Sequence, residues 1–228
     1  MKIVLLPGLD GTGILFRPLL DHLAPDLSPV VVSYPPDRFL DYGQLLERVL
    51  GALPRDGPFV LLGESFSGPL ALMAAATRPA GLKAVVLSAT FIQNPTWVRW
   101  SGLAAFVRPF AFRFYPMFSA AKALLGRYST AELRRQIAEA IGAVRPEVFS
   151  QRVRAVLRVN VADELLACPV PILYLRGSRD LVVPGRNLRE ILRLAPAVKA
   201  VTLDAPHMVL QTQPAAAARA IRDFARAL

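Results

Sequence analysis

The segment that most constrains the fold is the turn Gly-Glu-Ser-Phe-Ser-Gly at positions 63–68, which joins two apolar runs. The run before it, 59–62, is short and entirely apolar and predicts a buried strand. The run after it, 69–76, predicts a helix packed close to that strand. A sharp turn of this kind exposes the hydroxyl of Ser65, and a helix N-terminus behind it favours developing negative charge. The turn therefore predicts an enzyme with a serine nucleophile.

Apolar runs and helical patterns alternate along most of the chain. The strand-like runs are short and rich in Val, Ile and Leu, as is typical of strands covered on both faces. They are Ile3–Leu6, Val30–Ser33, Phe59–Leu62, Ala84–Ser88, Pro171–Arg176 and Lys199–Leu203. Helical patterns lie at about 13–24, 41–53, 68–78, 186–195 and 214–227. Repeated strand–helix units predict an α/β fold with a doubly wound, mostly parallel sheet and right-handed crossovers.

One segment, 93–162, interrupts this alternation and is too long for an ordinary connection. Its first part is crowded with aromatic residues, and its second part has a helical pattern. We therefore expect a core formed by residues 1–92 and 163–228. The segment 93–162 is expected to be a helical cap inserted over the carboxyl ends of the strands.

Two helices are predicted in the second part of this segment. Ser129 and Glu132 have the spacing of a capping box, and the apolar residues that follow fall on one helical face. These apolar residues are Leu133, Ile137 and Ile141. Pro146 is suited to open a further helix, which would carry Val148, Phe149, Val153 and Val156.

Composition limits the class of protein. The chain of 228 residues is 54% hydrophobic, but no apolar run approaches the roughly 18 residues that a membrane-spanning helix needs. The opening run, 1–7, is too short for a signal peptide and instead predicts a first core strand. The single cysteine, Cys168, excludes an internal disulfide and fits a reducing compartment, so we expect a cytoplasmic protein. Cys168 precedes a proline in an apolar stretch and is predicted to be a small buried residue.

The formal net charge of +10 is unevenly distributed. Residues 91–162 contain ten Arg and one Lys against three Glu. One interpretation is general arginine richness with solvated helix faces, since 23 of the 27 basic residues are Arg. The other is an anionic partner at the cap, such as an acidic carrier protein, a phospholipid surface or a free carboxylate. No groove-reading motif accompanies the charge, so nucleic acid is not expected.

Acyl transfer by serine requires a base, a carboxylate that orients the base, and donors for the oxyanion. The chain has two histidines. His22 lies in a helical pattern near Asp21 and is expected at the surface, whereas His207 follows the last predicted strand. In a parallel sheet, a loop at that strand end faces the turn that carries Ser65, so His207 is the candidate base.

Asp180 is the candidate acid because it follows a buried strand and a glycine turn. It could instead cap the helix that begins near Pro184. Three other carboxylates are less well placed, because none follows a strand in this way; they are Asp163, Glu164 and Asp204. The order Ser65, Asp180, His207 is that of one hydrolase architecture.

The oxyanion donors are expected to be backbone N–H groups. Phe66 follows the nucleophile and supplies one, and Leu9 is the first choice for the other, with Asp10 second. Leu9 and Asp10 lie in the glycine-rich stretch 7–13 after the first strand. Taken alone, this stretch could cradle a phosphate, but it has neither of the usual glycine spacings of such loops.

Taken together, these features resemble the α/β-hydrolase superfamily over nearly the whole chain. The shared features are the loop at 7–13, the turn at 63–68, the Gly177–Asp180 turn with Val183-Pro184 beyond it, and the His207 loop. The resemblance implies a helical cap at 93–162 after the sixth strand of the family, with the chain beginning at the third. The opening stretch 6–13 is also similar to hydrolase-fold acyltransferases that act on lipid alcohols.

One residue departs from the family pattern. The turn usually reads Gly-x-Ser-x-Gly, but position 67 is Ser, with Gly68 directly after it. Small residues are needed there because the helix and its neighbouring strand approach closely. We expect the turn to form, and the added hydroxymethyl group could narrow the site.

These features predict a serine hydrolase of carboxylic esters that forms an acyl-enzyme and needs no metal or organic cofactor. With two histidines and one cysteine, the chain has no recognisable metal-ligand spacing. The aromatic, basic cap suggests a small-molecule or lipid-like ester with an apolar acyl group. Aromatic residues that could line its pocket are Phe91, Trp97, Trp100, Phe110 and Phe114. The alternative, which is the commoner case for aromatic residues in a helical cap, is that they only pack inside it. The alternatives are acyl transfer or thioester cleavage by the same three residues, and a non-catalytic hydrolase fold that binds ligands.

Overall fold

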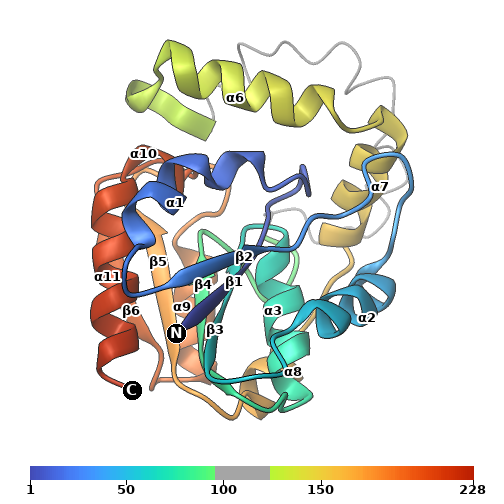
Figure 1. Ribbon diagram of the computed structural model, residues 1–228. Helices are drawn as coiled ribbons and strands as arrows, with labels where there is room; N and C mark the ends of the chain where they lie inside the picture. The colour runs from blue at the N-terminus through green and yellow to red at the C-terminus, as the bar shows by residue number, and fades with distance from the viewer. Residues whose placement is uncertain (96–123) are drawn as a thin grey trace.

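A parallel six-stranded sheet forms the centre of the molecule in the computed structural model, which describes residues 1–95 and 124–228 (Figure 1). The strands run in the spatial order β2-β1-β3-β4-β5-β6, and every neighbouring pair is parallel. Their bounds are β1 Lys2–Leu6, β2 Ser28–Val31, β3 Phe59–Glu64, β4 Leu82–Ser88, β5 Ile172–Gly177 and β6 Lys199–Leu203. The predicted doubly wound parallel sheet is confirmed.

Helices cover both faces of the sheet, as the apolar strands require. Within the described residues, eleven helical elements of the core and the predicted cap surround the strands. They are η1 Ile14–Phe16, α1 Arg17–Leu23, α2 Tyr42–Ala52, α3 Ser67–Ala76, η3 Gly126–Tyr128, α6 Ala131–Gly142, α7 Pro146–Val156, α8 Ala162–Ala167, α9 Arg186–Leu194 and α10 Val209–Thr212, followed by the C-terminal α11 Pro214–Arg226.

The alternation of side chains along each strand creates two separate apolar layers. On β1, Val4 and Leu6 pack with α2, α3, α8 and α9 on one face. Ile3 and Leu5 point the other way and pack with α1, α10 and α11. Because the central strands are buried on both faces, the loops at their carboxyl ends are held on a rigid base.

The described part of the predicted cap lies across the top of the sheet in Figure 1, with α6 above and α7 beside it. An antiparallel bridge between Gln93 and Asn160 brings the two ends of the segment together. A small apolar cluster joins α6 to the loop after β6; it contains Leu125, Leu133, Ile137 and Met208. The division into core and cap remains a proposal.

Four details differ from the sequence expectations. β2 begins and ends two residues earlier than predicted. The short helices α8 and α10 were not predicted. Thr130, rather than Ser129, caps α6, because its side chain accepts the N–H of Leu133. Cys168 is only partly buried, at the end of α8, and packs against the edge of the core.

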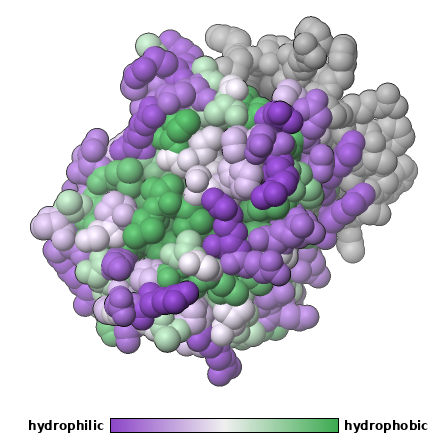
Figure 2. All heavy atoms as spheres, turned by 45° about the vertical axis from the view of Figure 1, so that its right-hand side comes forward, coloured by the Kyte–Doolittle hydropathy of each residue, from purple (hydrophilic) through white to green (hydrophobic). Residues whose placement is uncertain are grey.

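The outer surface carries both hydrophilic and hydrophobic side chains. On the face in Figure 2, hydrophilic side chains surround an apolar area. Within residues 1–95 and 124–228, no helix is both long and apolar enough to cross a membrane.

Candidate active site

The turn after β3 holds Ser65 in a strained backbone conformation. Its φ is +48°, a left-handed value that a non-glycine residue adopts at a cost of about 1–3 kcal/mol. Three hydrogen bonds hold it there. The Ser65 N–H donates to the Ser88 carbonyl (2.9 Å), while the Ser65 carbonyl accepts from Thr90 Oγ1 (2.5 Å) and from the Gly68 N–H (3.1 Å). The surrounding structure therefore presents the Ser65 hydroxyl at the carboxyl end of the sheet.

The two glycines of this turn allow α3 to lie close to its neighbours. A Cβ on Gly63 would come within 2.3 Å of the Ser67 carbonyl oxygen, and one on Gly68 within 2.0 Å of Thr90 Oγ1. Real Cβ atoms do not approach so closely, so both positions require glycine.

Ser67, the residue that departs from the family pattern, points away from the cavity beside Ser65. It is fully buried, and its hydroxyl donates to the Pro7 carbonyl. The Tyr34 hydroxyl lies 2.6 Å from Ser67 Oγ and is the donor of that pair, because the Ser67 proton is already used. Burial raises the pKa of Tyr34, which keeps this donor protonated. Ser67 is not among the residues that line the cavity, so its hydroxymethyl group does not narrow the site there. Its hydroxyl instead links the turn to the loop after β1.

The three residues proposed for catalysis lie in one hydrogen-bonded row. His207 Nε2 is 3.0 Å from Ser65 Oγ, and His207 Nδ1 is 2.9 Å from Asp180 Oδ2. The imidazole side chain is 8% exposed and the carboxylate 2%. Asp180 Oδ1 accepts the N–H groups of Val182 and Val183, each at 2.8 Å. Asp180 thus has one oxygen fixed by backbone and the other aimed at the imidazole, and it does not cap α9.

The competing histidine and one competing acid lie elsewhere. His22 is exposed on α1. Asp204 is exposed and forms ion pairs with Arg127 of η3 and with Arg179. Hydrogen bonds from Tyr128 and Arg179 lower the pKa of Asp204 to about 2. Asp204 therefore links the loop after β6 to the predicted cap.

The other two competing acids, Asp163 and Glu164, lie on α8. Glu164 lines a separate cleft rather than the cavity beside Ser65.

The proposed oxyanion donors lie beside Ser65. Leu9 and Asp10 line the same cavity as Ser65, and Phe66 directly follows it. Within the described part of the chain, the N–H groups of these three residues donate no hydrogen bond. Free N–H groups next to a nucleophile are what an oxyanion hole requires. The structure leaves both Leu9 and Asp10 available as the second donor.

The cavity beside Ser65 has a volume of about 160 Å³ and a mostly apolar lining. Seven apolar residues contribute, from η1, the predicted cap and the loops of Asp180 and His207: Leu15, Leu124, Ile137, Ile141, Phe149, Val182 and Met208. Sequence analysis did not assign these residues to the pocket. The apolar face of α6 was the available signal, but it could not show that Ile137 and Ile141 face Ser65.

Of the five aromatic residues considered for the pocket lining, only Phe91 lies within the described residues. Phe91 is buried and is not among the lining residues of this cavity. The other four lie outside the described residues; they are Trp97, Trp100, Phe110 and Phe114.

A buried carboxyl group, Glu64, adjoins Ser65 and was also missed. It lines the cavity, and Gln211 Nε2 donates to Glu64 Oε1 at 2.9 Å. Burial raises the pKa of Glu64 to about 7, while the Gln211 hydrogen bond and His207 oppose the shift. A group that titrates near neutral pH therefore lies beside the proposed nucleophile.

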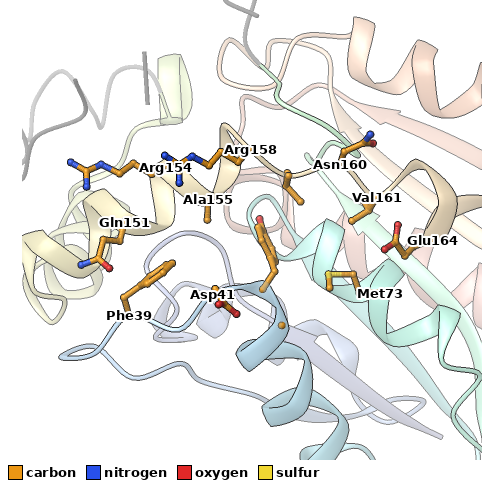
Figure 3. Close-up of a pocket in the computed structure, with 13 residues that line it drawn as sticks. Phe39, Asp41, Met73, Gln151, Arg154, Ala155, Arg158, Asn160, Val161 and Glu164 are labelled. Carbon is orange, nitrogen blue, oxygen red and sulfur yellow. The ribbon is translucent and has the colours of Figure 1, made fainter. Parts of the chain in front are cut away.

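A larger cleft of about 720 Å³ lies apart from the triad, between α7, α8 and the N-terminus of α2. In Figure 3, Arg154 of α7 and Arg158, just after this helix, extend along the upper rim of the cleft, and Phe39 and Asp41 lie below them. Its lining contains neither Ser65 nor His207. We therefore place the chemistry in the smaller cavity.

Curated proteins with similar sequences are esterases by name. The chain is 29% identical over 218 residues to the pimeloyl-[acyl-carrier protein] methyl ester esterase of Xanthomonas oryzae pv. oryzae, covering 88% of this chain and 85% of that protein. A Xylella fastidiosa protein of the same name is 26% identical over 212 residues, covering 86% and 82%. These similarities support the expectation of a carboxylic ester hydrolase.

Solved structures share the fold. The enol-lactonase from Burkholderia xenovorans LB400 superposes with a TM-score of 0.80 at 17% identity, covering 99% of this chain and 91% of that chain. A thermophilic esterase from Thermogutta terrifontis gives a TM-score of 0.84 at 19% identity, covering 99% and 89%. The model of the alpha/beta hydrolase family matches residues 3–220, almost the whole chain. The fold, the strained serine turn and this match together show that the chain belongs to the alpha/beta hydrolase family.

Proposed function

We propose that this protein is a serine hydrolase of carboxylic esters whose catalytic residues are Ser65, His207 and Asp180. The observation that carries the proposal is the hydrogen-bonded row from Asp180 through His207 to Ser65, with distances of 2.9 and 3.0 Å. A base within hydrogen-bond reach of a nucleophile, itself oriented by a carboxylate, is the arrangement that activates serine.

The reaction begins with proton transfer from Ser65 Oγ to His207 Nε2 while Oγ attacks the ester carbonyl carbon. Asp180 accepts a hydrogen bond from the His207 Nδ1–H group without taking its proton, which keeps Nε2 free to act as base. The C=O electron pair moves onto the carbonyl oxygen, and N–H groups of Phe66 and of Leu9 or Asp10 stabilise the oxyanion. The tetrahedral intermediate then collapses, and the leaving alcohol takes the proton from His207.

Hydrolysis of the acyl-enzyme repeats these steps with water. His207 removes a proton from water, the resulting hydroxide adds to the acyl carbon, and Ser65 leaves with the proton from His207. The products are the free acid and the regenerated serine.

The cavity and the named relatives together suggest the substrate class. The apolar lining beside Ser65 suits a hydrocarbon segment next to the ester. The relatives are named for a methyl ester of an acyl group on acyl-carrier protein. We infer that this chain cleaves a small-alcohol ester at the end of an acyl chain borne by an acidic carrier.

Positive charge on the predicted cap supports a carrier as partner. Arg154 and Arg158 line the cleft beside α7, within the segment that carries ten arginines. Such a surface attracts an acidic protein and accelerates its association, and salt weakens the effect.

The test uses a methyl ester of a dicarboxylic acyl chain in two forms, attached to purified acyl-carrier protein through its thioester and free as a neutral diester. Product masses separate methyl ester cleavage from thioester cleavage and from transfer to an added alcohol. We expect methanol release from both forms. Raising the salt from 50 to 500 mM should lower kcat/KM about tenfold for the carrier form only.

Ser65→Ala is the matched control and should lower both rates by roughly 10⁴- to 10⁶-fold. Equal salt dependence for the two forms would refute the carrier. Thioester cleavage or alcohol acylation as the main product would move the activity to one of the alternative classes.

A further inference from the structure

Arg152 is a buried guanidinium that the proposed reaction does not yet use. It lies on α7 of the predicted cap and is 1% exposed. Its Nη1 donates to the carbonyls of Leu9 (3.0 Å) and Asp10 (2.6 Å), and its Nη2 donates to the Pro35 carbonyl at 2.9 Å.

No carboxylate forms an ion pair with this guanidinium among the described residues. The Asp10 carboxylate accepts from Thr12 instead, and the Tyr34 ring lies 5.8 Å from Arg152 Cζ. Burial lowers the pKa of Arg152, with the Asp10 charge opposing the shift. Burying a charge costs several kcal/mol unless its partners compensate, and an apolar side chain could fill the space without that cost. The three hydrogen bonds to backbone carbonyls are the contacts that compensate this cost.

The Arg152 guanidinium holds the loop that carries the proposed oxyanion donors. In a planar trans peptide, the C=O and the following N–H point in opposite directions. Fixing the Leu9 carbonyl therefore directs the Asp10 N–H. Fixing the Asp10 carbonyl directs the Gly11 N–H, which donates to the Gly8 carbonyl at 3.0 Å. The Gly8 carbonyl in turn sets the direction of the Leu9 N–H.

Every carbonyl from position 7 to position 11 accepts a hydrogen bond. Ser67 Oγ donates to Pro7, the Gly11 N–H to Gly8, and the Tyr34 N–H to Gly11 at 2.7 Å. Arg152 supplies the other two, at positions 9 and 10. One side chain from the cap thus controls both candidate donors of the loop.

We propose that Arg152 is a positioning residue for the oxyanion hole, so that α7 takes part in the reaction without touching the substrate. Its guanidinium fixes and polarises the peptide groups that follow Leu9 and Asp10, and through the Gly11 N–H it also orients the peptide group that follows Gly8. Polarisation makes the N–H groups of the loop better donors to developing negative charge. The inference rests on the proposed function, because it assumes an oxyanion formed by attack of Ser65.

The experiment compares Arg152→Met with wild type on a neutral soluble p-nitrophenyl ester. Active enzyme is counted by fluorophosphonate titration, so that an unfolded fraction does not enter kcat. We expect kcat to fall about 10- to 100-fold with KM changed less than about threefold. The affinity for a trifluoromethyl ketone, which adds to serine as a tetrahedral oxyanion, should fall in parallel with kcat/KM. If Arg152 had only a packing role, neither the ketone affinity nor kcat/KM of the titrated enzyme would change.

Arg145→Met is the control: it removes a charge from the exposed start of the same helix and should leave kcat and the ketone affinity unchanged. If Arg152→Met does not fold, Arg152→Lys decides the question. Lysine keeps the charge but lacks the two-armed donor geometry, so kcat should fall about tenfold. Unchanged kcat and ketone affinity in the folded variant would overturn the proposal. Absence of esterase activity and of labelling in wild type would instead refute the proposed function.

Discussion

The rim of the sheet and the predicted cap that faces it organise their polar groups differently. At the rim, each proposed catalytic residue lies in the turn or loop that follows a strand: Ser65 directly after β3, Asp180 in the turn after β5 and His207 in the loop after β6. In the cap, Arg152 reaches carbonyls that are 143, 142 and 117 residues away in sequence. The proposed catalytic residues are thus placed by short local motifs, whereas the orientation of the proposed oxyanion loop depends on long-range contacts.

The two regions also differ in how they tolerate change. Ser65 and its neighbours are held by close backbone packing, which one added atom would disturb. Outer cap contacts such as the Arg17–Glu139 pair are exposed. Substitutions should therefore have large effects at the rim and small effects at the outer cap.

The largest effect is expected at the rim carboxylate. Asp180→Asn keeps the shape but presents an amide to His207 Nδ1, which favours the tautomer that cannot accept the Ser65 proton. We expect kcat for a p-nitrophenyl ester to fall by roughly 10⁴-fold with little change in thermal unfolding. A loss of kcat below about tenfold would show that Asp180 does not orient His207 for catalysis.

The next effect concerns packing at the turn. Gly68→Ala places a methyl group against Thr90, whose Oγ1 would lie 2.0 Å away, and should lower the free energy of unfolding by about 3 kcal/mol or more. Urea denaturation measures this. Gly51→Ala is the matched control, because nothing lies within 4 Å of its Cβ inside α2, and it should stabilise the protein by up to about 1 kcal/mol. Equal effects at both glycines would contradict the close packing.

A third effect is the pH dependence that Glu64 contributes. Burial raises its folded pKa to about 7, against 4.5 for an ordinary glutamate. Between these values the unfolded chain releases the proton while the folded protein keeps it. Stability therefore falls as pH rises through this window, by about 3 kcal/mol in total from this group.

Glu64→Gln removes this titration and keeps a side chain of similar shape. The fall in unfolding free energy from pH 5 to pH 8 should therefore be smaller in the variant by about 2.5 kcal/mol. Urea denaturation at both pH values measures the free energy of unfolding. Gln211, which donates to the Glu64 side chain, is unchanged in the variant. The same pH slope in the two proteins would mean that Glu64 is ionised throughout.

The smallest effect is expected at the outer cap. Arg17 and Glu139 join η1–α1 to α6 through two hydrogen bonds of 2.9 and 2.8 Å, but both side chains are exposed. Exposed pairs contribute little. Arg17→Met should leave the melting temperature and ester hydrolysis unchanged, as measured by calorimetry and a p-nitrophenyl ester assay. A large loss in either would show that the cap depends on this contact.

The sheet and the proposed triad could be predicted from the sequence because their signals are local. Buried strands are continuous apolar runs, and a carboxylate or an imidazole after a strand of a parallel sheet must lie at one edge. β2 was placed two residues late because it is an edge strand with an exposed pattern. Its burial signal is therefore weak.

The role of Arg152 could not be predicted in this way. In the sequence it is one of ten arginines in the cap, and its helical period does not distinguish it from Arg154 or Arg158. Its burial follows only from the packing of α7 against the oxyanion loop. Ser67 was misjudged for the same reason, since its partners Tyr34 and Pro7 lie far away in the sequence.

The central claim is that Ser65 is the nucleophile, and covalent labelling tests it most directly. The native protein is treated with a fluorophosphonate, digested and analysed by mass spectrometry, beside Ser65→Ala and His207→Ala. The account predicts one adduct, on the Ser65 hydroxyl, that is absent from Ser65→Ala and forms far more slowly in His207→Ala. Ester hydrolysis by wild type without any adduct on Ser65, or full hydrolysis by Ser65→Ala, would contradict it.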